Sequence, residues 1–225
     1  MLLGGKQVIN KQSKVTVILI AINIIIFLLM TIDGGSTSAN VLISFGAKDN
    51  LLIADGQFWR LFTAMFLHIG FQHIVLNMVT LYFLGSQIEY IFGSIRFLII
   101  YLISGIGGNI VSFALSPSIS AGASTAIFGL FGAYLALGLE FKQNPYIQTV
   151  AKQFFILVIL NLISDLSGSI DIWGHIGGLI TGFLLAFIVG VPQLGKIKSS
   201  KRWLAGITVI LLFSVFYSIG LNNIY

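Results

Sequence analysis

Apolar stretches of about twenty residues recur along the chain, separated by shorter segments that hold most of its charges. A helix needs about 20 apolar residues to cross the hydrocarbon core of a bilayer. We expect membrane-spanning helices at residues 15–32, 71–93, 96–115, 121–140, 150–166, 172–192 and 203–221. Ten-residue strands of alternating polarity are absent, so the pattern predicts an all-α membrane protein, a polytopic helical bundle of about seven spans. The fifth stretch is the weakest candidate, because Lys152 and Gln153 lie near its start. Six or eight spans are the alternatives to seven.

The segment between the first two stretches, residues 33–68, is the one long connection. It mixes charged residues with aromatic residues such as Phe58 and Trp59, so it is too polar to span and too apolar for a free loop. An interfacial segment that lies partly in the outer leaflet fits this composition. No repeat, low-complexity run or linker divides the sequence, and we expect residues 1–225 to form a single membrane domain.

Composition supports a membrane protein and excludes several other classes. Hydrophobic residues make up 57% of the chain and charged residues 8%, whereas about a quarter of the residues in soluble domains are charged. The chain has no cysteine, which excludes disulfides and thiolate metal sites. The net charge of +5 does not indicate nucleic-acid binding, because the basic residues lie in short connections between apolar stretches.

The same basic residues predict the orientation of the spans. If the N-terminus is cytoplasmic, seven spans leave only Lys48 and Arg60 on the outer side, as expected from the excess of Lys and Arg in cytoplasmic loops. The C-terminus then lies outside, and the first stretch, which is longer than a signal-peptide core, remains an uncleaved span. The ten basic residues assigned to the cytoplasmic side are Lys6, Lys11, Lys14, Arg96, Lys142, Lys152, Lys196, Lys198, Lys201 and Arg202.

Four polar residues stand out within the apolar stretches: His73, Asn77, Ser124 and His175. The three stretches that contain them all enter the membrane from the outer side, so each residue falls near the start of its helix. His73 and Asn77 lie one turn apart on one helix face. An ionisable residue within a span is a functional hypothesis by default. With this topology, all four residues lie in one layer near the outer surface of the membrane.

Small residues predict that two of these helices pack closely. In the sixth stretch, Gly or Ala recurs at every fourth position, at residues 174, 178, 182, 186 and 190, and the fourth stretch is also rich in small residues. Such stripes let helix backbones approach each other in lipid. If these faces meet, His175 lies beside Ser124.

Together these residues favour serine-protease chemistry. A serine becomes an effective nucleophile when a base takes its proton, and neutral imidazole suits that task near pH 7. The oxyanion of the tetrahedral intermediate needs preorganised donors, for which His73, Asn77 and the Ser124 N–H are candidates. A site near the outer end of the helices also admits water for deacylation.

In combination and in order, these motifs resemble the rhomboid intramembrane serine proteases of bacterial type. The resemblance covers residues 15–192 and rests on Trp59-Arg60, His73-x-x-x-Asn77, Gly122-x-Ser124 and His175 followed by Gly178. It implies a Ser124–His175 dyad with His73 and Asn77 at the oxyanion. It also implies six core helices, with residues 203–221 as a C-terminal addition. In the usual Gly-x-Ser-Gly pattern, Thr125 here replaces the second glycine.

Five further residues are expected to support the structure without taking part in the chemistry. Glu89, near the inner end of the second stretch, is expected to brace the cytoplasmic end through hydrogen bonds. Phe128, one turn beyond Ser124, is expected to pack against the His175 ring. The resemblance implies that Trp59 and Arg60 anchor the loop; without it, they fit an ordinary interfacial aromatic residue and cation. Gly178 is the fifth of these residues and is part of the motif that begins at His175.

Two other assignments remain open at this level. Asp171, four residues before His175, can complete a Ser-His-Asp triad, although an aspartate at the outer end of a span is usually a solvated flank. His68, His73 and His175 are a conceivable set of zinc ligands, but no acidic or cysteine ligand joins them at a useful spacing. Interfacial structure is the simpler interpretation of His68.

The sequence therefore predicts a serine endopeptidase of the plasma membrane that needs neither cofactor nor metal. Its expected partners are membrane lipid and transmembrane protein substrates, cut near the outer face at segments with helix-breaking or small residues; no nucleic acid is expected. An inactive rhomboid-like protein that binds membrane clients is one alternative. A transporter or channel is another, but the polar residues cluster at one end and no inverted repeat with broken helices is present.

Overall fold

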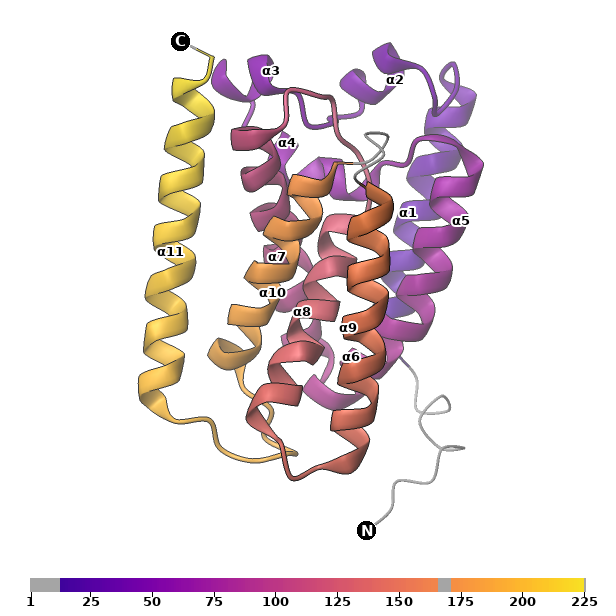
Figure 1. Ribbon diagram of the computed structural model, residues 1–225. Helices are drawn as coiled ribbons and strands as arrows, with labels where there is room; N and C mark the ends of the chain where they lie inside the picture. Colours follow the sequence, from indigo (N-terminus) through magenta and orange to yellow (C-terminus); the bar gives the residue numbers. More distant parts are fainter. Residues whose placement is uncertain (1–12, 166–170, 225) are drawn as a thin grey trace.

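The computed structural model of the chain describes residues 13–165 and 171–224, which fold into a bundle of long helices (Figure 1). A π-helical turn, η2 (Leu81–Gly85), joins α5 (Gly70–Thr80) to α6 (Ser86–Phe92), so that residues 70–92 form one continuous helix. The connection between α1 (Lys14–Ile32) and α5 holds the short helices α2 (Ala39–Ser44), α3 (Asn50–Ala54), α4 (Arg60–Thr63) and η1 (Ala64–Phe66). The long helices are α1 (Lys14–Ile32), α5 (Gly70–Thr80) with α6 (Ser86–Phe92), α7 (Ser94–Leu115), α8 (Ser124–Glu140), α9 (Pro145–Asp165), α10 (Ile172–Val189) and α11 (Ser199–Asn222).

Six helices in the described part of the chain are long and apolar enough to cross a membrane: α1, the continuous helix Gly70–Phe92, α7, α9, α10 and α11. The fourth predicted span is the shorter α8, whose 17 residues begin at Ser124 instead of residue 121. The fifth begins earlier than expected, at Pro145, because proline fits the first turn of a helix. Residue 166, the predicted end of that span, lies outside the described residues. The predicted all-α polytopic bundle is confirmed.

The long helices alternate in direction between two ends of the bundle. α5, α8 and α10 begin at the end drawn at the top of Figure 1, which we call the upper end, whereas α1, α7, α9 and α11 begin at the lower end. Lys48 and Arg60 belong to the segment at the upper end. Lys6 and Lys11 lie outside the described residues. The remaining basic residues lie toward the lower end: Lys14, Arg96, Lys142, Lys152, Lys196, Lys198, Lys201 and Arg202.

The centre of the bundle is α8, which packs against α7, α9 and α10. Nearly all of its residues from Thr125 to Leu137 are buried. By contrast, α1, α9 and α11 lie at the periphery and expose large apolar side chains such as Ile25, Leu160 and Ile210. An apolar outer surface around a buried central helix is what a bundle presents to lipid. The position of Ser124 at the start of α8 is thus set by the most enclosed helix of the fold.

Residues 33–68 fold over the upper end of the bundle. Phe58 and Trp59 are 56% and 57% exposed, which fits the predicted interfacial position of this segment. Arg60 is buried, and its Nη1 donates to the carbonyls of Ile43 and Ala47 at 2.8 and 3.0 Å. Arg60 therefore anchors the segment through backbone carbonyls, whereas the Trp59 ring lies at the surface as an interfacial aromatic.

The carboxylate of Glu89 connects α6 to the start of α1. Its oxygens accept hydrogen bonds from the N–H groups of Val15 and Thr16 at 3.1 and 2.8 Å, and from the hydroxyls of Thr16 and Ser94 at 2.8 and 2.6 Å. The first N–H groups of a helix have no partner within the helix, and a carboxylate there satisfies them and favours the helix dipole. Glu89 thus connects the two helices at the lower end by capping α1.

Candidate active site

Ser124 is the first residue of α8, and the turn before it lies close to the side chain of His73. Gly122 has a φ of +152°, which side chains disfavour, and its N–H donates to the Ala64 carbonyl at 3.0 Å. A Cβ atom on Gly122 would lie 2.8 Å from His73 Cε1, 3.0 Å from His73 Nε2 and 3.4 Å from Ser124 Oγ. The His73 ring and the Ser124 hydroxyl therefore converge on one point, which a glycine leaves open.

A hydrogen bond identifies the protonated nitrogen of His73. The Ile69 N–H donates to His73 Nδ1 at 3.4 Å. A neutral imidazole that accepts a hydrogen bond at Nδ1 carries its proton on Nε2, which is the nitrogen beside Gly122. Asn77, one turn further along α5, is buried and donates from Nδ2 to the His73 carbonyl at 2.9 Å. Its amide retains a second N–H.

His175 lies in the first turn of α10 and is 5% exposed. Its ring stacks on Phe128, with ring centroids 4.1 Å apart and an interplanar angle of 11°. Phe128 is one helical turn beyond Ser124 on α8. The stacking therefore holds the imidazole against the first two turns of α8.

Glycines bring α8 and α10 into backbone contact. A Cβ atom on Gly178 would lie 2.0 Å from the Thr125 carbonyl oxygen, and one on Gly182 would lie 2.0 Å from the Gly129 carbonyl oxygen. No side chain fits at either position while the two helices keep this separation. The small-residue stripe in the sixth stretch therefore has the predicted function, because it lets α10 pack directly on the backbone of α8.

The rhomboid-domain family model matches residues 55–192, a range that includes the four polar residues His73, Asn77, Ser124 and His175. The chain belongs to the rhomboid family. With its long apolar helices, this rhomboid is a multi-pass membrane protein.

Relatives come from bacteria, plants and a protozoan. The chain is 43% identical over 215 residues to rhomboid protease GluP of Bacillus subtilis, covering 95% of this chain and 42% of GluP. It is 42% identical over 163 residues to RHOMBOID-like protein 2 of Arabidopsis thaliana, covering 70% and 51% of the two chains. It is 36% identical over 157 residues to Rhomboid-like protease 1 of Toxoplasma gondii, covering 67% and 54%. This rhomboid thus spans about half the length of these curated relatives.

Thr125 occupies the position where the usual rhomboid pattern has glycine, and neighbouring glycines make room for it. A Cβ atom on Gly108 of α7 would lie 2.8 Å from Thr125 Cβ, and one on Gly174 of α10 would lie 3.1 Å from Thr125 Cγ2. The side chain of Thr125 is buried between these two helices. In this rhomboid the extra volume on α8 is therefore accommodated by glycines on both neighbouring helices.

The position of Asp171 is explained by capping. Its carboxylate accepts a hydrogen bond from the Gly174 N–H at 3.2 Å and another from the Ser112 hydroxyl of α7. A carboxylate at this position satisfies an N–H that has no partner within α10. Asp171 thus ties the start of α10 to α7.

His68 is fully buried behind His73. The two rings meet edge to face with centroids 5.2 Å apart, and the Ala123 N–H donates to His68 Nε2 at 3.4 Å. Burial, with the nearby His73, lowers the pKa of His68 to about 3, so the ring is neutral. Among the described residues, no three His, Asp or Glu side chains are grouped to hold a metal ion, which leaves the zinc alternative without a ligand set there.

Lys48, which the sequence did not single out, fastens the connection that leads into α8. Its backbone pairs with Ser120 through hydrogen bonds of 2.9 and 3.0 Å. Its side chain is fully buried, and Nζ donates to the carbonyls of Ser116 and Ser118 at 2.7 and 2.9 Å. A lone lysine in a polar connection is usually solvated, so no sequence pattern reveals this burial.

The stability contribution of Lys48 is expected to rise with pH. Burial lowers the pKa of Lys48 from 10.5 to about 8, although Asp171 and Asp49 raise it. Between these two values the unfolded chain binds more protons at Lys48 than the folded chain does, so the free energy of unfolding increases with pH. We expect a gain of about 2 kcal/mol between pH 7 and pH 9.5.

To isolate this gain, the free energy of unfolding is measured for the wild type and for Lys48→Met by reversible unfolding in detergent micelles. The difference in unfolding free energy between wild type and Lys48→Met should grow with pH in favour of the wild type. The exposed Lys142→Met variant should show no such slope. A difference that stays flat from pH 7 to pH 9.5 contradicts the prediction.

Proposed function

We propose that this rhomboid is an intramembrane serine endopeptidase that cleaves transmembrane-anchored proteins near the outer face of the plasma membrane. Ser124 and His175 form its catalytic dyad. The observation that carries the proposal is the convergence of polar groups at the upper end, where Ser124 meets His73 at Gly122 and Phe128, one turn beyond it, stacks on His175. Relatives named as rhomboid proteases support the class of reaction.

The chemistry begins with His175 as general base. It takes the proton from Ser124 Oγ as the oxygen attacks the scissile carbonyl carbon, and it then returns the proton to the leaving amine. Stacking on Phe128 restricts the rotation of the imidazole and supports this role, because a base must be held in reach of the hydroxyl. Ser124 is half-buried at the upper end, which leaves access for the water that hydrolyses the acyl-enzyme.

The oxyanion of the tetrahedral intermediate is stabilised by donors around Gly122. His73 contributes Nε2–H, since its Nδ1 accepts the Ile69 N–H. The first N–H groups of α8, including that of Ser124, have no partner within the helix. The second N–H of Asn77 completes the set. Donors already in place before the reaction stabilise developing negative charge without reorganisation.

The asymmetry of basic residues supports an orientation with the lower end in the cytoplasm. The site then opens toward the outer face, and the C-terminus lies outside. A protease must receive its substrate as extended backbone. Transmembrane segments with helix-breaking or small residues near their outer ends are therefore the expected substrates. The reaction needs no metal or cofactor, because the proton is transferred by His175 and the charge is stabilised by N–H groups.

A fluorophosphonate probe tests the nucleophile directly. Purified wild-type protein in detergent should be labelled on the peptide that contains Ser124, and Ser124→Ala should remove the label. Ser118→Ala is the matched control, because Ser118 is exposed in the connection just before α8. It should leave labelling unchanged. If folded wild-type protein neither cleaves a transmembrane substrate nor takes up the label on Ser124, the proposal is wrong and an inactive rhomboid-like binding protein is favoured.

His73→Ala is expected to lower kcat by about 10²–10³-fold with little change in KM, the usual cost of removing one oxyanion donor. Initial rates on a transmembrane substrate in detergent measure this effect. Gln72→Ala, an exposed neighbour on the same turn of α5, should retain wild-type kinetics. A loss smaller than about tenfold would assign His73 to packing instead of oxyanion stabilisation.

A further inference from the structure

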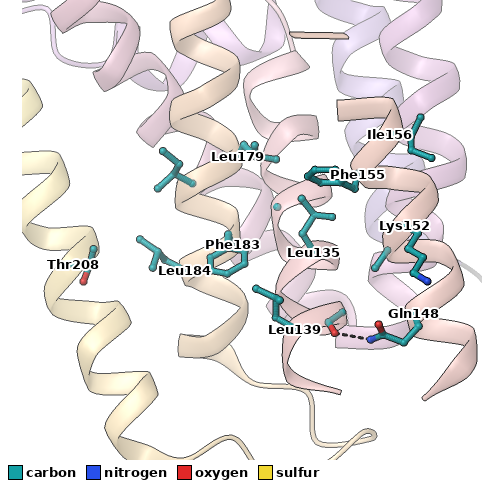
Figure 2. Close-up of a pocket in the computed structure, with 14 residues that line it drawn as sticks. Leu135, Leu139, Gln148, Lys152, Phe155, Ile156, Leu179, Phe183, Leu184 and Thr208 are labelled. Atoms are coloured by element: carbon teal, nitrogen blue, oxygen red, sulfur yellow. Dashed lines mark hydrogen bonds between the residues drawn. The ribbon is translucent and has the colours of Figure 1, made fainter. Parts of the chain in front are cut away.

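The lower half of the bundle contains a groove that the proposed chemistry does not use. It has a volume of about 840 Å³ and lies between α8, α9 and α10, with Thr208 of α11 at its margin (Figure 2). Small-molecule sites in proteins usually measure about 300–1,000 Å³. The residues lining the groove begin at Gly132 on α8, two turns below Ser124, so the groove is separate from the candidate active site.

The groove exists because α9 packs on α8 but has few contacts with α10. The α8–α9 contact is close near the lower end, where a Cβ atom on Gly138 would lie 2.6 Å from Ala151 Cβ. Apolar side chains from the three helices line the gap that remains: Leu135, Leu139, Phe155, Ile156, Leu179 and Phe183.

One charged side chain, Lys152, is present among the described residues that line the groove. The other long polar groups are engaged, since Gln148 Nε2 donates to the Gly138 carbonyl at 2.6 Å and the Thr208 hydroxyl donates to the Leu204 carbonyl at 2.9 Å. Lys152 is exposed and makes no hydrogen bond or ion pair with any residue that the structure describes.

The ammonium group of Lys152 extends toward the lower end of α9, beside Gln148 (Figure 2). Long basic side chains reach the interface in this way while their methylene groups cover apolar surface. The acidic residue at the end of α8, Glu140, pairs with Lys201 at 2.5 Å. The lower rim of the groove therefore offers a cation with no acidic partner from α8.

We infer that the groove binds one phospholipid with an anionic headgroup, from the leaflet at the lower end. An acyl chain fills the apolar space, and the headgroup phosphate pairs with Lys152. Residues 148–156 of α9 extend for about 12 Å along the groove, a path that a hydrocarbon chain follows. A helix from a second copy would cover the ammonium with apolar surface, which is costly in lipid, whereas an anionic lipid satisfies the apolar wall and the charge together.

Native mass spectrometry of the purified full chain in neutral detergent tests the inference, with phosphatidylglycerol and phosphatidylcholine of identical acyl chains as probes. We expect about fivefold tighter binding of phosphatidylglycerol, the ratio equivalent to about 1 kcal/mol for one basic residue near a membrane surface. Lys152→Gln should reduce this ratio to about one. Leu135→Trp, which fills the groove, should weaken binding of both lipids.

Lys142→Gln is the matched control, because it makes the same charge change at the lower end outside the groove. It should keep the fivefold preference. Equal loss of preference in Lys142→Gln and Lys152→Gln would overturn the inference in favour of a diffuse surface charge. A dimer that Leu135→Trp abolishes would overturn it in favour of a second copy in the groove.

Discussion

Ser124→Ala is expected to abolish cleavage of a transmembrane substrate, and His175→Ala to lower it by at least about 10³-fold. Ser124 supplies the attacking oxygen, and alanine leaves no atom that can form the acyl-enzyme. Without His175 the hydroxyl keeps its proton, which makes it a poor nucleophile near neutral pH. Both variants should keep the helical bundle, because removing a half-buried hydroxyl or a ring in the first turn of α10 leaves the α8–α10 backbone contacts unchanged.

The double variant tests whether the two residues act as one unit. Residues that act as one unit are strongly non-additive, so Ser124→Ala with His175→Ala should be no slower than Ser124→Ala alone. Cleavage is measured by gel with purified protein in detergent, and thermal unfolding checks that each variant is folded. Ser199→Ala, at the exposed start of α11, is the control and should cleave normally. Cleavage that persists in folded Ser124→Ala would show that another group is the nucleophile.

Gly178→Ala is expected to reduce cleavage by about 10²-fold and to lower the free energy of unfolding by about 1–3 kcal/mol. The new methyl group would lie 2.0 Å from the Thr125 carbonyl oxygen. A backbone oxygen cannot rotate away, so α10 must move off α8. His175, three residues earlier on α10, moves with it, and a displacement of about 1 Å at a catalytic group is enough to cost about two orders of magnitude in rate.

Gly206→Ala separates this effect from helix propensity. Gly206 lies within α11, and nothing lies within 4 Å of a Cβ atom built there. Alanine should therefore be tolerated or stabilise the protein by up to about 1 kcal/mol, with unchanged cleavage. If folded Gly178→Ala cleaves at the wild-type rate, close α8–α10 packing is not needed to position His175.

Much of the fold is already determined by the sequence, because lipid allows few solutions. A backbone in hydrocarbon must satisfy its own polar groups, so apolar stretches of sufficient length predict helices within a few residues. The same argument makes polar residues such as His73 and His175 conspicuous inside apolar stretches. A Gly or Ala at every fourth position of the sixth stretch predicted a backbone contact, and Gly178 and Gly182 make it with α8.

Only the tertiary structure decided how groups far apart in the chain are paired. Lys48 is buried because the carbonyls of Ser116 and Ser118, about 70 residues away, accept its protons. Asp171 caps α10 and accepts a hydrogen bond from the Ser112 hydroxyl of α7. These contacts distinguish Asp171 from an aspartate that is only solvated at the end of a span. The groove between α8, α9 and α10 exists because α9 packs on α8 and has few contacts with α10. Hydropathy and spacing report local preferences, whereas these features arise from contacts between separate helices and connections, so they become visible once the bundle is assembled.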